Sequence, residues 1–325
     1  MPVVDERIPA VETSGTTRMA SFRHFLAWLL LPPVLVYLAG FALVCLPSYE
    51  RWSGSKWAPT LEYAFKTAGQ DADIVVYGDS TALYGVDPLQ MEKDLGLKVI
   101  NLPNTMGSLP VVDDLSLYQY LAHNRPPKLI VFYMSSWNLN YMNPWGPRLF
   151  EGEEMLLRHG SWNRIFHFAV HHLEETLNFP FRVYSGLGPH AIIDLLRSSH
   201  AVPEVVASRG HEVNDLPVGP LSSGCSLPDV LVQEHDTASV QALINRYSTP
   251  QTKTMLYLSP VPGCQNAGAL LSSIRAKNNI PAALPAVLPA GDFSSDNMYA
   301  HVRPDAVTAS TDLLTRAVRS RQEAK

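Results

Sequence analysis

The sequence predicts an α/β domain in which helices cover both faces of a mostly parallel sheet, preceded by one N-terminal helix that is apolar enough to cross a membrane. The first observation is a set of short apolar runs, rich in β-branched and aromatic residues, that end at Gly, Ser or Pro. Such runs are typical of parallel strands buried on both faces. They lie at 74–77, 97–102, 128–134 and 254–260, with a fifth strand expected at 283–288.

The second observation is that helical patterns separate these strands. Alternation of strand and helix is typical of a three-layer α/β/α domain with a doubly wound sheet. We expect helices at 58–68, 86–95, 112–124, 237–247, 267–278 and 304–319. The domain covers 51–325, with an insertion at about 141–235 that has no strand pattern and two helical pieces, 163–177 and 191–200.

The third observation is the apolar N-terminus. Residues 1–22 are polar and are expected to form a disordered cytoplasmic tail, and 23–48 form a nearly uncharged run of the length that spans a bilayer. A cleaved signal peptide is the alternative, but the run is too long and lacks a small-residue cleavage site close behind it. Arg18 precedes the run and Arg23 begins it, which favours a cytoplasmic N-terminus and an exported domain.

The composition excludes nucleic acid as a partner. Charged residues make up 17% of the 325 residues and the net charge is -5, so there is no basic surface of the kind that binds nucleic acid.

Cys45 lies within the apolar run, whereas Cys225 and Cys264 lie in loop-like segments. An exported domain favours a disulfide between these two, and a pair of free buried thiols is the alternative.

Polar residues follow the predicted strands and mark a candidate site. Ser80 ends the segment Gly78-Asp79-Ser80 directly after the first strand, Gly107 follows the second, and Asn138 follows the third. His301 lies in the loop before the last helix. The carboxyl ends of parallel strands form the usual ligand site of an open α/β sheet, so we expect these residues to lie at one edge. The simpler interpretation is that Gly78-Asp79-Ser80 is only a turn, with Asp79 stabilising it.

Acyl transfer would use these residue types together. It needs a nucleophilic hydroxyl, a base to accept its proton, a carboxylate to orient the base, and N–H donors for the oxyanion. Ser80, His301 and Asp296 are the candidates for the first three roles.

At these positions the sequence resembles the SGNH/GDSL hydrolases, whose fold is flavodoxin-like. The matching segments are Gly78-Asp79-Ser80, Gly107, Ser136-Trp137-Asn138, the stretch 296–301, and Pro304-Asp305-Ala306. The resemblance covers about 71–140 and 250–320. It implies that Ser80 is the nucleophile, that His301 is the base, and that the N–H groups of Ser80 and Gly107 with the Asn138 side chain form the oxyanion hole.

Two departures from the family pattern concern the carboxylate and the third segment. The family places its aspartate three residues before the histidine, where this chain has Met298; Asp296 lies five residues before it, and Asp292 is the second choice. A backbone carbonyl can also orient an imidazole. The third segment has Ser136 where the family has glycine and Leu139 where it has aspartate. Asn138 has a simple loop-capping role as its alternative.

A single-pass anchor before such a domain resembles the branch that contains bacterial cell-envelope acyl-transfer proteins, such as those that acetylate alginate or cellulose. The resemblance implies a serine esterase or O-acyltransferase at the periplasmic side of the inner membrane. Its substrate would be acyl groups, in particular acetyl groups, of an envelope or secreted polysaccharide, with a membrane-embedded acyl donor protein as partner. The alternatives are a catalytically weak binding subunit of a polysaccharide synthesis or export complex and a membrane-held esterase for lipids or small esters.

This chemistry requires no metal or organic cofactor. His167, His171 and His172 have the spacing of a metal site on a helix, but no matching Asp, Glu or Cys lies near them in the sequence. A solvated or membrane-facing helix surface is therefore the better interpretation of the three histidines.

Overall fold

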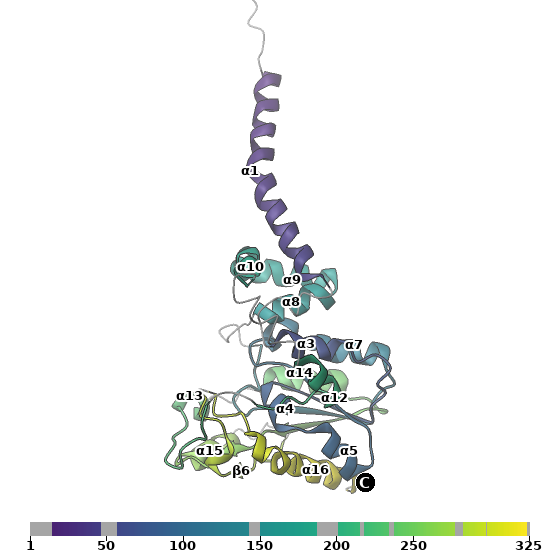
Figure 1. Ribbon diagram of the computed structural model, residues 1–325, viewed down its shortest axis with the longest axis vertical. Helices are drawn as coiled ribbons and strands as arrows, with labels where there is room; N and C mark the ends of the chain where they lie inside the picture. Colours follow the sequence, from purple (N-terminus) through teal and green to yellow (C-terminus); the bar gives the residue numbers. More distant parts are fainter. Residues whose placement is uncertain are drawn as a thin grey trace, which may run out of the picture.

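The structure is a computed structural model that describes residues 15–46, 57–142, 150–186, 201–214, 218–233, 237–276, 282–296 and 298–323. A long N-terminal helix extends away from a mixed α/β domain, and a group of short helices lies between them (Figure 1). The candidate site belongs to the α/β domain.

Four parallel strands form the main sheet in the order β2-β1-β3-β4. Their bounds are β1 (Ile74–Gly78), β2 (Val99–Pro103), β3 (Leu129–Met134) and β4 (Lys253–Leu258). Every residue of the first three is buried, which explains why their sequences are continuous apolar runs rather than alternating ones. The register pairs Gly78 with Pro103 on one side and Tyr133 on the other, so the carboxyl ends of these strands are level.

Glycine is required at the end of β1 because the neighbouring strand approaches it closely. A methyl group on the Cα of Gly78 would lie 1.9 Å from the carbonyl oxygen of Tyr133 and 2.8 Å from the Cβ of Ala82. Backbone cannot yield at such a distance, so the residue two positions before Ser80 has no room for a side chain.

Helices pack against both faces of the sheet. Val75 and Tyr77 share an apolar cluster with α3 (Ala58–Phe65), α7 (Leu115–His123), α14 (Ala238–Tyr247) and α15 (Ala267–Ala276). Ile74 and Val76 share another with α4 (Ser80–Gly85), α5 (Pro88–Leu95) and α16 (Val307–Glu323). Successive residues of a strand point to opposite faces, so a fully apolar strand supplies both clusters.

Most predicted elements agree with these bounds to within a few residues. The helix expected at 112–124 is instead divided into α6 (Leu109–Val112) and α7, because Asp113 has a φ of 48° that no α-helix accommodates. The last helix begins with a 3₁₀ turn, η2 (Pro304–Ala306). The short helices α12 (Ala201–Ala207), α13 (Asp229–Gln233) and η1 (Ala290–Asp292) complete the described domain.

The fifth strand expected at 283–288 does not extend the main sheet. Its last two residues form β6 (Val287–Leu288), which pairs with β5 (Val261–Pro262) in a separate two-stranded sheet. Pro285 and Pro289 bracket β6, and proline cannot donate a hydrogen bond to a neighbouring strand. Pairing is therefore confined to two residues.

The N-terminal helix α1 (Gly15–Val44) begins before the expected anchor at 23–48, and its segment Phe22–Val44 is long and apolar enough to span a membrane. Its mean hydropathy is 2.1, and only 11% of the most apolar window is buried within the protein. The helix continues through Pro32 and Pro33. Residues 1–14, and the expected end of the anchor at 47–48, lie outside the described residues.

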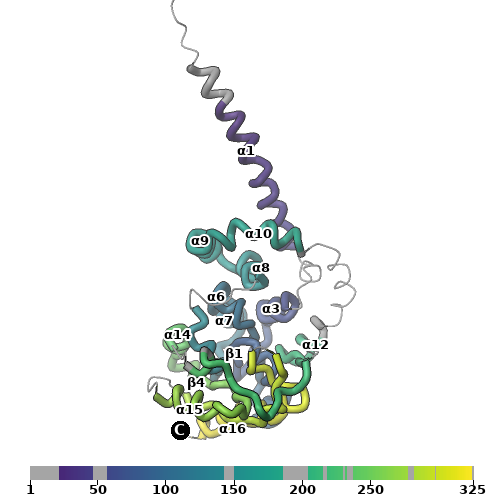
Figure 2. Tube along the Cα trace, turned by 90° about the vertical axis from the view of Figure 1, so that its left-hand side faces the viewer, coloured from purple at the N-terminus to yellow at the C-terminus, as the bar shows by residue number. Residues whose placement is uncertain are grey.

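The insertion places three helices between α1 and the sheet (Figures 1 and 2). They are α8 (Phe150–His159), α9 (Trp162–His171) and α10 (Leu173–Gly186). The helix expected at 163–177 is therefore α9 together with the first turn of α10, with a break at His172. The helix expected at 191–200 lies outside the described residues.

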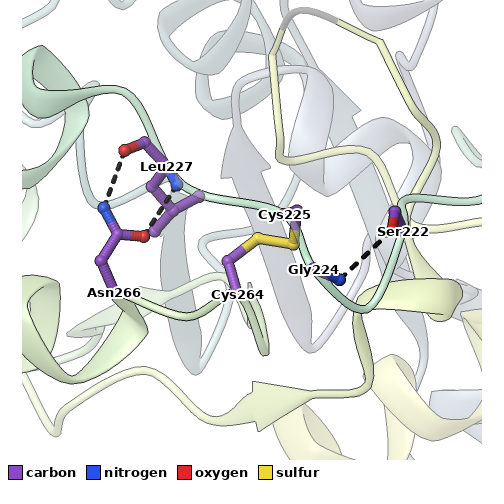
Figure 3. The surroundings of a disulfide bond; sticks show 6 residues. All are labelled: Ser222, Gly224, Cys225, Leu227, Cys264 and Asn266. Atoms are coloured by element: carbon purple, nitrogen blue, oxygen red, sulfur yellow. Dashed lines mark hydrogen bonds between the residues drawn. A yellow bond between two sulfur atoms is a disulfide. The ribbon is translucent and has the colours of Figure 1, made fainter.

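Cys225 and Cys264 form a disulfide, the pairing that the exported topology favours (Figure 3). A second pair of bonds lies beside it: the Asn266 side chain accepts from the Leu227 N–H at 2.8 Å and donates to the Leu227 carbonyl at 2.8 Å. The disulfide and the amide together join the loop before α13 to the start of α15.

Candidate active site

Ser80 is the first residue of α4, directly after the turn that ends β1. Asp79 is the N-cap of that helix: its Oδ1 accepts from the Thr81 N–H at 2.9 Å and from the Thr81 hydroxyl at 2.5 Å. A capping aspartate fixes the direction in which a helix leaves its strand. The turn-stabilising role considered for Asp79 is confirmed, and Ser80 opens a short helix that is not among the elements expected from the sequence.

The second carboxylate oxygen of Asp79 faces the end of β3. Its Oδ2 accepts from the Ser135 N–H at 3.2 Å, from the Ser135 hydroxyl at 3.0 Å and from Asn138 Nδ2 at 3.0 Å. Asp79 is 1% exposed. One buried carboxylate therefore connects the turn that carries Ser80 to the loop that carries Asn138.

Three side chains from two segments far apart in the sequence form a continuous hydrogen-bonded series. His301 Nε2 lies 2.8 Å from Ser80 Oγ, and His301 Nδ1 lies 2.5 Å from Asp296 Oδ2. The carboxylate can only accept, so Nδ1 carries the proton and Nε2 is free to accept from the serine hydroxyl. Ser80 and His301 are both buried, and Asp296 is partly buried. Asp296, rather than Asp292, is thus the carboxylate that contacts the imidazole.

The loop before His301 explains how an aspartate five residues away reaches the ring. Asp296 Oδ1 accepts from the N–H groups of Met298 and Tyr299 at 3.0 and 3.2 Å, and Tyr299 has a φ of 53°. The chain therefore turns back on itself, and the Ser294 N–H donates to the His301 carbonyl at 2.9 Å to close the loop. One carboxylate oxygen supports the turn while the other faces the histidine.

Tyr84 is a neighbour of the imidazole that sequence reasoning did not identify. Its ring meets the His301 ring edge-on, with centroids 5.0 Å apart and an interplanar angle of 74°. Tyr84 lies four residues after Ser80 on α4, and residues at this spacing share a helix face. The four-residue spacing from Ser80 is the sequence feature that could have identified Tyr84 as part of the site. The aromatic contact restricts the rotation of the imidazole.

The second loop of the site follows β2. The Asn104 N–H donates to the Gly78 carbonyl at 2.8 Å, which holds the start of this loop beside the turn that carries Ser80. Thr105 and Ser108 cap each other, with each hydroxyl oxygen accepting from the other's N–H at 3.0 and 2.8 Å. Gly107 is buried within this closed turn, and among the described residues it forms no hydrogen bond to Ser80, His301 or Asn138.

The predicted site residues therefore fall into two groups. Ser80, His301 and Asp296 contact each other directly, and Asn138 reaches them through Asp79. Gly107 lies in the loop after the adjacent strand β2 and, among the described residues, forms no hydrogen bond to them. Asn104 adds a buried side-chain amide to the same loop, and its Nδ2 has no acceptor within the described part of the chain.

His211 supports the Ser80 helix from outside the site. Its Nδ1 donates to the Leu83 carbonyl at 3.0 Å, and the Glu212 N–H donates to the same oxygen at 3.2 Å. Burial lowers the pKa of His211, although the hydrogen bond to Leu83 and the charge of Asp87 oppose the effect. The uncharged imidazole is therefore the form that packs against α4.

The histidines of α9 do not form a metal site with other described residues. The rings of His167 and His171 stack with centroids 4.1 Å apart. Within the described segments, no group of three or more His, Cys, Asp or Glu side chains is arranged to hold a metal ion.

Comparison with known protein families, curated proteins and solved structures gave no match to this chain.

Proposed function

We propose that the protein is a serine esterase or O-acyltransferase of the SGNH type, held at a membrane by α1. The observation that carries the proposal is the hydrogen-bonded series Ser80–His301–Asp296, with bonds of 2.8 and 2.5 Å. A hydroxyl, an imidazole and a carboxylate in this order are the parts that nucleophilic acyl transfer needs, whatever the fold that carries them.

Features of the fold support the same proposal. Apolar clusters on both faces of the sheet fit a three-layer α/β/α arrangement. The order β2-β1-β3-β4 agrees with the first four positions of the flavodoxin-like order 2-1-3-4-5. Ser80 and the loops with Gly107 and Asn138 follow the carboxyl ends of three adjacent strands, where open α/β sheets place their ligands.

In the proposed reaction, the Ser80 Oγ attacks the carbonyl carbon of an ester while His301 Nε2 takes the hydroxyl proton. Asp296 holds the ring in the required tautomer and stabilises the imidazolium that forms. The tetrahedral intermediate collapses when Nε2 returns the proton to the departing alcohol, which leaves an acyl group on Ser80. Water or a sugar hydroxyl then attacks this ester, with His301 again acting as the base.

The oxyanion of the tetrahedral intermediate needs fixed N–H donors. We assign this role to the N–H groups of Ser80 and Gly107 and to the Asn138 side-chain amide. Asn138 has two amide hydrogens, and Asp79 binds its nitrogen at 3.0 Å, so the amide is oriented before substrate arrives.

The proposed substrate is an acylated, in particular acetylated, polysaccharide of the bacterial cell envelope or a secreted one. The proposed location is the inner membrane with the α/β domain in the periplasm. The apolar segment Phe22–Val44 supports a membrane anchor, and the Cys225–Cys264 disulfide supports an oxidising compartment. The polysaccharide and a membrane-embedded acyl donor as partner rest on the family resemblance alone.

The test uses the full chain in detergent with a fluorophosphonate serine probe and a chromogenic acetyl ester. Wild type should be labelled and should hydrolyse the ester, whereas Ser80→Ala should lose the label and about 10³-fold or more in kcat/KM. His301→Ala should lose activity to a similar degree. Ser272→Ala is the control because Ser272 lies on α15 and its hydroxyl donates to the Gly268 carbonyl of the same helix.

Each result selects one function. If the probe does not label wild type and Ser80→Ala hydrolyses the ester as fast, the enzyme proposal is wrong and a binding subunit is the better description. Adding an unacetylated oligosaccharide to the reaction and measuring its mass then separates transfer from hydrolysis. Faster turnover on glycerolipid esters than on acetylated glycans would support the membrane-held lipid esterase instead.

A further inference from the structure

The helices α9 and α10 carry apolar side chains that the protein does not cover. On α9, Trp162, Phe166 and Val170 are spaced four residues apart and are 75%, 70% and 57% exposed. On α10, Leu173, Leu177 and Phe181 repeat this spacing and are 60%, 65% and 77% exposed. Residues four apart lie on one helix face, so each helix presents an apolar stripe outward. We call these six residues the outer stripes.

The opposite faces of the two helices already make the contacts that hold them to the protein. Ile165 and Phe168 of α9 pack on the apolar cluster that contains Leu156 of α8. Arg164 pairs with Asp114 at 2.8 Å, which ties α9 to the start of α7. On α10, Phe179 is buried and Arg182 pairs with Glu153 of α8 at 3.0 Å. Apart from the Trp162 ring, which also stacks on Phe41 of α1, the outer stripes are therefore a second apolar surface, beyond what internal packing requires.

Both helices contact α1 within the segment that is apolar enough to span a membrane. The Tyr184 hydroxyl of α10 donates to the Val36 carbonyl at 2.9 Å, and the ring of Trp162 stacks on Phe41 with centroids 6.1 Å apart. Figure 2 shows α10 beside the domain-proximal end of α1. Val36 precedes Val44, the end of the span, by a rise of about 12 Å at 1.5 Å per residue. A hydrocarbon core of about 30 Å that encloses this span therefore also reaches α10.

A cavity of about 290 Å³ lies between α1 and the helices α8, α9 and α10. Leu38 and Phe41 of α1 line it on one side, and Ile165, Phe168 and Phe179 line it on the other. Its lining is almost entirely apolar, and α1 places it at the depth of the acyl chains. An apolar cavity at that depth is suited to a lipid chain.

We propose that α9 and α10 are embedded in the membrane leaflet next to the α/β domain, with lipid acyl chains against the outer stripes and in the cavity beside α1. The proposal rests on the membrane-spanning role of α1. Asn163, His167 and His171 form a polar stripe next to the apolar one on α9, as in helices that lie in the interface with polar side chains among the headgroups. An attachment through one helix would thereby become a broad one that holds the domain at the membrane surface.

The test measures lipid contact in the full chain, reconstituted in vesicles of phosphatidylcholine and phosphatidylglycerol. In a Cys45→Ser background, Phe166→Cys and Phe181→Cys are labelled with an environment-sensitive fluorophore without reductant, so that the disulfide stays closed. Lipids with brominated acyl chains then quench labels that lie among the chains. Leu35→Cys in α1 is the control for the span, and Leu89→Cys, an exposed apolar site on α5 at the far end of the domain, is the aqueous control.

The labels at 166 and 181 should lose fluorescence to the same extent as the label at 35, and the label at 89 should lose none. If the label at 35 is quenched and those at 166 and 181 are not, this inference is wrong while the anchor stands. If the label at 35 is unquenched, the anchor itself fails. If the unlabelled cysteines at 166 and 181 resist a membrane-impermeant thiol reagent while the labelled ones are unquenched, a second copy of the chain covers the stripes, which also overturns the proposal.

Discussion

Asn138 Nδ2 donates to Asp79 Oδ2 at 3.0 Å, so the residue that caps the Ser80 helix also holds the amide at the end of β3. The two residues are 59 positions apart in the chain and their strands are neighbours in the sheet. Five donors from Thr81, Ser135 and Asn138 converge on this one carboxylate. The geometry of the proposed nucleophile and that of the proposed oxyanion donor therefore depend on the same side chain.

Replacing Asp79 with alanine should affect stability and activity together. The change leaves buried donors unpaired, and hydrogen bonds to charged groups are worth about 1.5–3 kcal/mol each without being additive, so we expect Asp79→Ala to lower the free energy of unfolding by about 3 kcal/mol. Ester hydrolysis should fall as well, because both Ser80 and Asn138 lose their support. Urea unfolding and the kcat of the folded fraction measure the two effects.

Asp87 provides a matched control for that substitution. It caps α5 by accepting from the Leu89 and Gln90 N–H groups, but it makes no bond to another strand. Asp87→Ala should cost about 1 kcal/mol, the usual value of an N-cap, with kcat unchanged. Equal losses for the two variants would mean that the bonds from Asp79 to the β3 loop contribute nothing.

The spacing between Asp296 and His301 leads to a second prediction. Asp296→Asn preserves the turn, because Oδ1 can still accept from Met298 and Tyr299, but it can no longer hold the imidazole in the tautomer that accepts from Ser80. We expect kcat/KM to fall by about 10³–10⁴-fold, as for loss of an orienting aspartate in other triads. Asp292→Asn should stay within about twofold of wild type, because the hydrogen bonds that Asp292 makes to described residues come from its backbone, to the Arg303 N–H and the Pro289 carbonyl. The opposite ranking would transfer the orienting role to Asp292.

The contact between these residues also shows where sequence reasoning reaches its limit. Strands β1 and β3 could be predicted because a strand that is buried on both faces has a continuous apolar sequence. The same pattern placed Ser80 directly after the first strand and His301 in the loop before the last helix. The reach of Asp296 could not, because it depends on Tyr299 adopting a φ of 53°, which no composition rule assigns to a tyrosine. Likewise, flanking prolines limit the strand expected at 283–288 to the two residues of β6, which pair with β5. The packing of α10 on α1 depends on contacts between segments far apart in the sequence.

Reduction of the disulfide should lower the stability of the domain without unfolding it. Cys225 and Cys264 are separated by 39 residues, and closing a loop of this length in the unfolded chain corresponds to about 4 kcal/mol. The Asn266 amide still joins the two segments through Leu227 after the sulfurs part (Figure 3). We expect Cys225→Ser with Cys264→Ser to lower the free energy of unfolding by up to about 4 kcal/mol and to keep the far-ultraviolet circular dichroism of wild type.

Reductant distinguishes the covalent bond from the packing of the sulfurs. Added to wild type, it should reproduce the stability of the double variant, and added to the variant it should change nothing. A wild-type unfolding midpoint that is insensitive to complete reduction would show that the bridge does not constrain the unfolded chain.

Acidification should destabilise the protein through His211. Burial lowers the pKa of His211 in the folded state, whereas in the unfolded chain it returns to about 6.5. Below that value the unfolded chain binds a proton that the folded protein does not, so stability falls as the pH falls, by at most about 1.4 kcal/mol per pH unit for one group. Above about 6.5 both states are neutral and the group contributes no pH dependence.

The comparison that isolates this group is the loss of unfolding free energy between about pH 7.5 and pH 5.5 in wild type and in His211→Asn. Asparagine can still donate to the Leu83 carbonyl but does not titrate, so the variant should lose less stability over this interval. His123→Asn, at an exposed position on α7, is the comparison variant. If His211→Asn keeps the wild-type slope, the neutral imidazole is not what secures α4, and the support of the Ser80 helix must come from the Glu212 N–H and the Asp79 cap.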